Sequence, residues 1–307
     1  PRTRALLNQY GAKVGGPLPF LHFGEGGPFL HSGKDKSFFF VNYEEFRLPQ
    51  ATARTRTVLL PSALTGDFRY LSGGVVQTVN VLTIAQAAGQ LSTVDPTVAA
   101  ILARIQSATQ QEGTFKEISN NYNSQSYNFI PSGDSTRKFL ALRLDFNLTK
   151  NHSLEFVTNQ QEFVPSKDFL NGQEERYPGF PWYTQGSNRD SYSFAVRSTL
   201  SEGIINEARY AVSIGLSQFS PGISKADFDY AQGYSLAFFG TTSPVSRNSY
   251  SDRNTPTYDF TDNVTALWGN HSIGFGGQYK IVRAEGSAFG RIVPSVGFGI
   301  DSTDPAF

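Results

Sequence analysis

The stretch Lys138-Phe139-Leu140-Ala141-Leu142-Arg143-Leu144-Asp145-Phe146-Asn147-Leu148 alternates between apolar and polar side chains from Leu140 onward. Alternate residues of a β-strand point to opposite faces, so one face here is apolar and the other carries charges and amides. The pattern resumes after Thr149-Lys150-Asn151, with Leu154 and Phe156 on the apolar side. We therefore predict a β-hairpin with a three-residue loop, in which Asn151 occupies a left-handed third position.

A second hairpin is predicted by the same alternation in residues 192–200 and 207–216. The two segments flank a turn at Ser201-Glu202-Gly203. If their apolar faces match, Arg197 lies opposite Glu207, and the two side chains form a cross-strand ion pair.

A third hairpin is predicted in residues 258–268 and 273–281, which flank a tight turn at Gly269-Asn270. Each predicted strand has roughly the 9 to 11 residues that cross a bilayer at a tilt. Trp268, on the apolar face beside the turn, suits the aromatic girdle of a transmembrane barrel.

Long connections alternate with the short turns and occupy residues 48–136, 165–188 and 219–254. Long loops without structure are uncommon in compact soluble domains, whereas barrels in outer membranes have short periplasmic turns and long extracellular loops. The chain is therefore predicted to be all-β, as an antiparallel transmembrane β-barrel. This orientation places Lys150, Gly203 and Asn270 at the periplasmic rim and the 48–136 loop outside.

The longest loop is predicted to contain one short helix over residues 96–108. Asp95 suits an N-cap and Pro96 the first helical position. The apolar residues of this segment share one helical face, which we expect to pack within the loop: Val98, Ile101, Leu102 and Ile105.

The composition narrows the class of protein. No run of about 18 apolar residues occurs, so any membrane span has to be a β-strand. The absence of Cys excludes disulfides and Cys-based metal sites. A net charge of +0, with dispersed Lys and Arg, gives no basic surface for nucleic acid.

The sequence contains no motif of a catalytic site, such as a nucleophile elbow, a phosphate-binding loop or a zinc-binding helix. The adjacent acids Glu44-Glu45 and Glu174-Glu175 point to opposite faces if they lie on strands, so we expect them to be solvated or lumen-facing. We expect no enzyme activity, metal or cofactor. The four His lie far apart, without metal-ligand spacing: His22, His31, His152 and His271.

The first part of the chain contains three motifs in order. Residues 8–14 and 36–44 predict strands joined by an irregular Gly/Pro connection. Asn8 to Pro17, Lys34 to Glu44, and Thr57 to Phe68 resemble the opening barrel segments of the Oar-like TonB-dependent receptors. The two later hairpins resemble this family more loosely, and the residues between Pro17 and Lys34 form an insertion relative to it.

The resemblance implies an outer-membrane transporter barrel of about 22 strands with a plugged lumen. Residues 1–307 would form a partial barrel domain of roughly the first eight or nine strands, with 295–300 as the last of them. The plug domain and the TonB box are absent from this chain. The implied partners are outer-membrane lipid, the plug domain of the same protein, the TonB energy-transducing complex and an unidentified extracellular ligand, at the bacterial outer membrane.

Two sets of residues are candidates for function. Clustered aromatic side chains on an exposed loop suit ligand contact, although packing within the loop explains them equally well: Tyr177, Phe180, Trp182 and Tyr183. Charged side chains on the polar strand faces line a substrate path or dock the plug, unless they only neutralise one another: Arg143, Asp145, Glu155, Arg197, Glu207, Arg209 and Asp259.

The alternatives come from two other classes of protein. One is an outer-membrane barrel that serves adhesion or secretion without active transport. The other is a soluble β-sandwich that binds carbohydrate through Trp182 and Tyr183.

Overall fold

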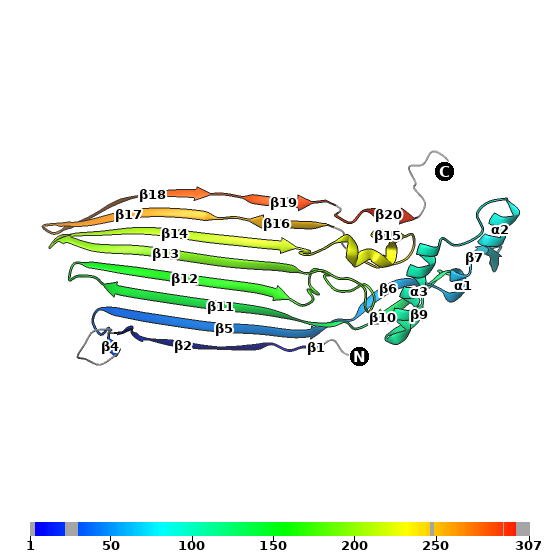
Figure 1. The fold of residues 1–307 in the computed structure, drawn as a ribbon, viewed down its shortest axis with the longest axis horizontal. Helices are drawn as coiled ribbons and strands as arrows, with labels where there is room; N and C mark the ends of the chain where they lie inside the picture. Colours follow the sequence, from blue (N-terminus) through cyan, green and yellow to red (C-terminus); the bar gives the residue numbers. More distant parts are fainter. Residues whose placement is uncertain (1–3, 22–29, 246–248, 291, 299–307) are drawn as a thin grey trace.

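Figure 1 shows one long sheet of mostly antiparallel strands, with helices and short strands gathered at one end. The computed structural model describes residues 4–21, 30–245, 249–290 and 292–298. Within these residues, no helix has the length and apolar character needed to cross a membrane. The strands of the main sheet are β1 (Arg4–Ala5), β2 (Asn8–Pro17), β5 (Ser37–Ala51), β11 (Ser132–Asn147), β12 (His152–Pro165), β13 (Gln185–Ser201), β14 (Ile204–Phe219), β16 (Tyr250–Asn254), β17 (Thr257–Trp268), β18 (His271–Val282) and β19 (Glu285–Phe289).

Several of these strands are sections of one longer strand. β1 and β2 both pair with β5, and β17 and β16 both pair with β14. In the same way, β18 pairs with β17 and β19 pairs with β16, so β18 and β19 form one longer strand. The described part of the sheet therefore consists of eight long strands, which agrees with the eight or nine predicted.

The first predicted hairpin is confirmed as β11 and β12, with Leu144 opposite Phe156. The backbone N–H of Leu148 donates to the carbonyl of His152 over 2.9 Å, so residues 149–151 form the predicted three-residue loop. The left-handed conformation predicted for Asn151 is wrong, since this residue has a negative φ. Thr149 gives the reason, because its hydroxyl accepts hydrogen bonds from the backbone N–H groups of Asn151 and His152, each at 3.1 Å.

The second and third hairpins are confirmed as β13–β14 and β17–β18. Two residues, Glu202 and Gly203, separate β13 from β14, and Gly269 and Asn270 separate β17 from β18. Gly269 has a φ of 59°, which favours glycine at this position. All three short turns lie at the same end of the sheet, opposite the helices (Figure 1).

The strands are longer than the predicted 9 to 11 residues, and β11 has 16. On its apolar face, the segment from Leu140 to Leu148 spans about 30 Å at ~3.4 Å per residue, which suits a hydrocarbon core crossed at a tilt. Beyond Leu140 the same face carries the ion pair of Lys138 Nζ with Glu162 Oε2 at 3.0 Å. The extra length therefore extends the sheet beyond the apolar band on the side of the long loops.

The two strands predicted near the start are confirmed as β2 and β5, which pair with Val14 opposite Val41. Their connection contains a small hairpin of β3 (Pro19–Leu21) and β4 (Leu30–Ser32). The remainder of the predicted Gly/Pro connection, residues 22–29, lies outside the described residues.

The long first loop is not irregular. Since β5 ends at Ala51 and β11 begins at Ser132, the predicted 48–136 loop shortens to residues 52–131. Three of its strands form a separate sheet in the order β6-β10-β9, and β7 and β8 form a hairpin. The elements are β6 (Arg54–Leu59), α1 (Pro61–Leu64), β7 (Asp67–Ser72), β8 (Val75–Asn80), α2 (Val81–Ala87), α3 (Pro96–Gln111), β9 (Thr114–Glu117) and β10 (Ser124–Phe129).

The predicted loop helix is confirmed as α3, which continues to Gln111. The side chain of Asp95 caps it by accepting from the N–H groups of Thr97 and Val98 at 2.8 and 3.2 Å. Ile101 and Ile105 are buried, as the predicted packing within the loop requires. The expectation of a single helix is wrong, since α1, α2 and the 3-10 helix η1 (Lys225–Ala231) also lie in the loops.

The last predicted strand of the barrel is also wrong. Its described part is β20 (Ser295–Phe298), which pairs in parallel with β15 (Ser235–Phe238) of the third long loop, away from the main sheet. Val293 is fully buried against Phe228 and other loop residues, so burial of this side chain draws the segment into the loops. Residues 299–300 of the prediction lie outside the described residues.

Two glycines on the polar face of β18 give a matched test of strand packing. A Cβ on Gly276 would collide with the backbone carbonyl of Asp262 and with Asn263, whereas a Cβ on Gly274 meets nothing within 4 Å. Gly276→Ala is expected to destabilise the barrel by about 1–3 kcal/mol, because overpacking displaces the neighbouring strand. Urea titration in lipid vesicles measures this, and Gly274→Ala is the control. A loss as large in Gly274→Ala would contradict the pairing of β17 with β18.

Candidate functional site

Charged side chains form a continuous chain of ion pairs across the polar face of β11 to β14, which we call the ion ladder. Arg143 pairs through Nε with Asp145 Oδ2 at 2.8 Å and through Nη2 with Glu155 Oε2 at 2.9 Å. Arg209 pairs through Nη1 with Glu155 Oε1 at 3.0 Å and through Nη2 with Glu207 Oε1 at 3.1 Å. Glu155 therefore joins the two arginines, and five of the seven predicted lumen residues lie in one network.

The other two predicted lumen residues lie outside the ion ladder. Asp259 pairs with Lys280 Nζ at 3.2 Å. Arg197 lies opposite Glu207 as predicted, but the predicted ion pair between them is wrong, because Glu207 pairs with Arg209 on its own strand. In the part of the chain that the structure describes, Arg197 takes part in no ion pair. With Lys280 included, the set has four acidic and four basic side chains, so the charges of this set balance.

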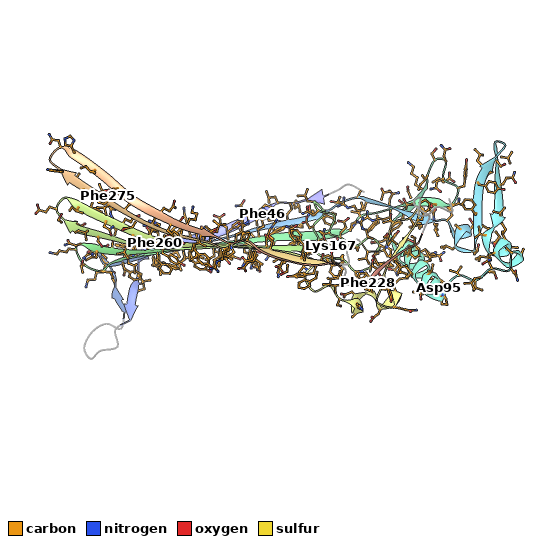
Figure 2. The ribbon with its side chains drawn as sticks, turned by 90° about the horizontal axis from the view of Figure 1, so that it is seen from above. Phe46, Asp95, Lys167, Phe228, Phe260 and Phe275 are labelled. Atoms are coloured by element: carbon orange, nitrogen blue, oxygen red, sulfur yellow. The ribbon has the colours of Figure 1, made fainter. Side chains whose placement is uncertain are left out.

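The opposite face of the same sheet is mostly apolar in its middle part, although it also carries Asp262. Its central row joins Phe39, Leu144, Phe156, Phe194 and Tyr210 across neighbouring strands. Figure 2 shows the sheet edge-on, with the labelled Phe260 and Phe275 of this face in the half that ends in the short turns. A sheet with one predominantly apolar face and one charged face is the pattern of a barrel wall between lipid and an aqueous lumen.

The three long loops pack on one another into a single structure, the loop assembly, defined as residues 52–131, 166–184 and 220–245. Its main apolar cluster takes side chains from all three loops, so each loop buries apolar surface against the other two. The buried members are Val58, Ile101, Ile105, Ala108, Tyr127, Phe129, Tyr177, Phe180, Ala231 and Leu236.

Two buried tyrosines form hydrogen bonds in the loop assembly, Tyr127 within the first loop and Tyr177 between loops. Tyr127 donates to the carbonyl of Glu112 over 2.6 Å, and burial raises the pKa of its hydroxyl to about 12. Tyr177 of the second loop donates to the carbonyls of Thr242 and Thr57 at 2.8 and 3.3 Å. Burial likewise raises the pKa of Tyr177, so both hydroxyls remain protonated donors at neutral pH.

Arg104 of α3 joins the loops through aromatic contacts. Its guanidinium lies 4.6 Å from the ring centroid of Phe180 and 4.5 Å from that of Tyr230, which belong to the second and third loops. Its Nη2 donates to the carbonyl of Gly179 over 3.0 Å. Contacts of this kind contribute about 0.5–1 kcal/mol at exposed sites and more where water is excluded.

The four predicted ligand-contact residues divide into two pairs. Tyr177 and Phe180 are only 0% and 2% exposed, so neither lies on the outer surface of the loops, and their contact with a ligand stays a prediction. Their apolar rings form the core of the loop assembly, as the alternative of packing within the loop requires. Trp182, which lies 5.8 Å from Lys167 Nζ, and Tyr183 are half-buried at its side, and their contact with a ligand stays a prediction.

One buried ion cluster was missed by the sequence analysis. Glu174, 3% exposed, accepts from Arg54 Nε at 2.8 Å and from Arg56 Nη2 at 3.1 Å. The expectation that Glu174 is solvated or lumen-facing is therefore wrong, because it lies buried in a loop and pairs with two arginines of β6. The alternation Arg54-Thr55-Arg56 was the available signal, since two arginines on one strand face require an acidic partner when buried.

The side chains that could hold a metal ion are dispersed. In the described ranges, no three His, Cys, Asp or Glu side chains come together as potential ligands. The candidate site therefore consists of the ion ladder, the apolar outer face and the loop assembly.

A strongly two-faced antiparallel sheet with short turns at one end and folded loops at the other defines a membrane-spanning β-sheet protein. A family model described as an outer membrane beta barrel domain matches residues 1–299. The chain belongs to this family, and its location is the bacterial outer membrane. Neither the curated proteins nor the solved structures contain a significant match to the chain.

Proposed function

We propose that the protein is an outer-membrane receptor of the TonB-dependent class, which takes up an extracellular ligand with energy from an inner-membrane complex. It acts as a transporter and not as an enzyme. The observation that carries the proposal is the loop assembly, because three loops that share one buried core form one folded unit at the end of the sheet opposite the short turns (Figure 1). A folded unit of this kind suits ligand capture, since a preformed site loses less conformational entropy on binding.

Two further features support the proposal. The motifs from Asn8 to Pro17 and from Lys34 to Glu44 resemble the opening of Oar-like TonB-dependent receptor barrels. The ion ladder is half exposed, with 50% of the Arg143 side chain and 38% of the Arg209 side chain accessible, so a plug domain has charged groups to dock against. Charged pairs across such a contact fix its register.

Energised uptake is tested with the full-length protein in cells. Solutes in the growth medium are compared by mass spectrometry for cells with and without the protein, each with and without a protonophore. Depletion of a solute that requires both the protein and the proton gradient is the expected result. Depletion that persists with the protonophore would show a passive channel instead and would overturn the proposal.

The ion ladder gives a sharper prediction. Arg209→Gln is expected to lower energised uptake about tenfold, because a close charge pair at an interface couples by about 1.5 kcal/mol or more. Its effect on barrel stability is expected to stay within about 1 kcal/mol, since the pairs of Arg209 are partly exposed. Lys138→Gln, which removes an ion pair from the outer face, is the matched control. Equal uptake by both variants would remove the ion ladder from the transport mechanism.

An adhesion role remains the alternative, and one feature favours it. The hairpin of β7 and β8 projects at the end of the loop assembly farthest from the short turns (Figure 1). Its exposed apolar side chains include Phe68, Tyr70 and Val75, which share one face of the hairpin. Deletion of residues 67–80 would abolish attachment to surfaces and leave uptake intact if the hairpin serves adhesion.

A further inference from the structure

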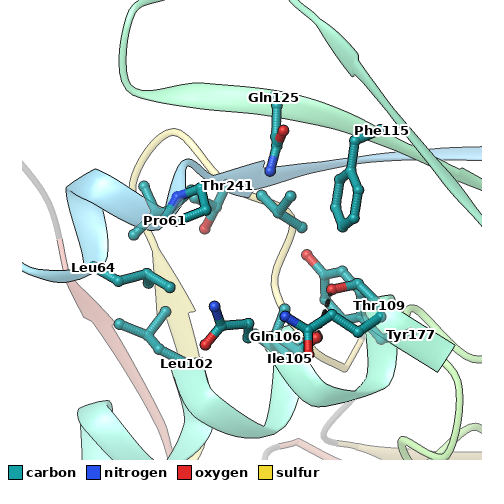
Figure 3. A pocket seen from close by; sticks show the side chains of 13 residues that line it. Pro61, Leu64, Leu102, Ile105, Gln106, Thr109, Phe115, Gln125, Tyr177 and Thr241 are labelled. Carbon is teal, nitrogen blue, oxygen red and sulfur yellow. Dashed lines mark hydrogen bonds between the residues drawn. The ribbon is translucent and has the colours of Figure 1, made fainter.

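The loop assembly contains an open pocket at the junction of its three loops (Figure 3). It has a volume of about 70 Å³. Val58 of β6, Ile105 of α3 and Tyr177 of the second loop are buried residues of its lining. Thr241 brings the third loop to the same pocket. A ligand in this pocket would therefore contact every loop at once.

The wall of the pocket is apolar. Leu64 of α1 and Leu102 of α3 lie side by side at one side of the space in Figure 3, and Phe115 of β9 lies at the other. No charged residue belongs to its lining, although charged side chains are frequent elsewhere in the loops. An ionised ligand group would lose hydration here without gaining a charged partner, so the occupant has to be neutral in this part.

Three glutamines complete the lining: Gln106 and Gln110 of α3 and Gln125 of β10. Figure 3 shows the side chains of Gln106 and Gln125 extending toward each other across the pocket. The hydrogen bonds found in the described residues include none from these three side-chain amides. Each amide offers two donors and one acceptor, so the pocket presents neutral hydrogen-bonding groups next to an apolar wall.

The volume limits the size of the apolar group. An apolar cavity of about 150 Å³ holds a benzene ring, so about half of that volume suits a branched aliphatic group of roughly four carbons. The glutamines beside it match a neutral amide or hydroxyl attached to that group.

We infer that this pocket is a binding site for a neutral molecule in which a branched aliphatic group lies next to an amide, as in a leucine-type unit. The inference deepens the proposed function, and it rests on that function for the fate of the bound molecule. The branched group packs against Leu64 and Leu102, and its amide pairs with the glutamines. The site is distinct from Trp182 and Tyr183, neither of which belongs to the lining.

Thiol protection in the full-length protein, reconstituted in lipid nanodiscs, tests the inference. The 307 residues contain no Cys, so Leu102→Cys places one reactive thiol of known position among them. The probe is N-acetylleucinamide, and the readout is the rate of reaction with a charged thiol reagent. At ten times its Kd, the probe is expected to slow the reaction about tenfold, since occupancy protects by a factor of 1 + [L]/Kd. Ala103→Cys, an exposed neighbour on α3 outside the lining, is expected to show no protection.

Two related probes test separately whether binding needs the branched group and whether it needs a neutral ligand. N-acetylglycinamide lacks the branched group and N-acetylleucine carries a carboxylate, so both are expected to protect at least about tenfold less well at equal concentration. Gln106→Ala is expected to weaken N-acetylleucinamide binding about threefold to tenfold through loss of a hydrogen bond. Equal protection by all three probes, protection at Ala103→Cys, or no protection by N-acetylleucinamide would each overturn the inference.

Two precautions keep the result interpretable. If Leu102→Cys fails to reach the outer membrane, Gln110→Cys at the exposed rim of the pocket replaces it with the same readouts. Protection without energised uptake would remove the proposed transport and leave the binding site. Energised uptake without protection would remove the binding site and leave the transport.

Discussion

Leu144→Arg is expected to destabilise the barrel in lipid by about 2–4 kcal/mol, because a basic side chain near the midplane of the lipid-facing surface is costly to bury. Leu144 lies between Phe39 and Phe156 on the apolar face of three adjacent strands. Val212→Arg is expected to have a similar effect, since Val212 lies between Tyr192 and Tyr258 on the same face. Urea titration of the full-length protein in lipid vesicles measures the free energy of unfolding.

The matched controls differ only in the face they occupy. Ser213 directly follows Val212 and points to the polar face, where its neighbours are Ser191 and Thr257. Ala141 lies between Asn42 and Asn159 on that face of β11. Ser213→Arg and Ala141→Arg are expected to change the free energy of unfolding by less than about 1 kcal/mol, because an aqueous lumen solvates the added charge. Equal losses on both faces would rule out the assignment of the apolar face to lipid.

The strands of the sheet were predictable from the sequence because a period of two is a local signal. The alternation from Leu140 to Leu148 depends only on which face each side chain occupies, and the register Leu144 to Phe156 follows from matching those faces. The first residues of β11, 132–136, were missed because polar and apolar side chains do not alternate in that part of the strand.

The loop assembly was not predictable, because its contacts join residues far apart in the sequence. Arg56 and Glu174 are separated by 118 residues, and Thr57 and Thr242 by 185. A local pattern identified the helix α3, since Asp95 caps it, but gave no sign of the loops that cover it. Segments of this kind gain their structure from mutual burial, which no single segment encodes.

The ion ladder was predictable only in part. Its residues were predicted from alternation, but the predicted pair of Arg197 with Glu207 was wrong. On a strand, residues two apart share a face, so Arg209 competes with the cross-strand Arg197 for the same carboxylate. Arg209 also reaches Glu155, so one guanidinium pairs with two acids there. The period of two in the sequence thus determines which face of the sheet a charged residue occupies. Which residue it pairs with depends on how far its side chain reaches.

Glu174→Gln is expected to destabilise the loop assembly by about 3–5 kcal/mol, because it leaves buried arginines without a counter-charge. The side chain of Arg56 is 7% exposed and that of Arg54 is 23% exposed. Burial lowers the pKa of Arg56, followed by repulsion from Arg176, while the hydrogen bond to Glu174 opposes both. Glu174 therefore stabilises the charged form of the buried Arg56 guanidinium.

Hydrogen exchange of residues 52–131 and 166–184 measures this effect. Slowly exchanging amides there are expected to exchange at least ~100-fold faster in Glu174→Gln, while the strands of the main sheet are unchanged. Glu162→Gln is the control, since its pair with Lys138 is 46% and 49% exposed and contributes at most about 1 kcal/mol. Similar exchange in both variants would show that the loops hold together without the buried ion cluster.

A compensated variant separates lost charge balance from lost packing. Arg54→Met, Arg56→Met and Glu174→Leu together remove every charge of the cluster and keep its apolar volume. Replacement of a buried ion cluster by apolar side chains is often neutral or stabilising, so this variant is expected to recover most of the protection lost in Glu174→Gln. Recovery would assign the loss to the unpaired arginines. Failure to recover would assign it to the geometry that the cluster imposes, including the bond from Arg54 to the carbonyl of Phe169 at 2.6 Å.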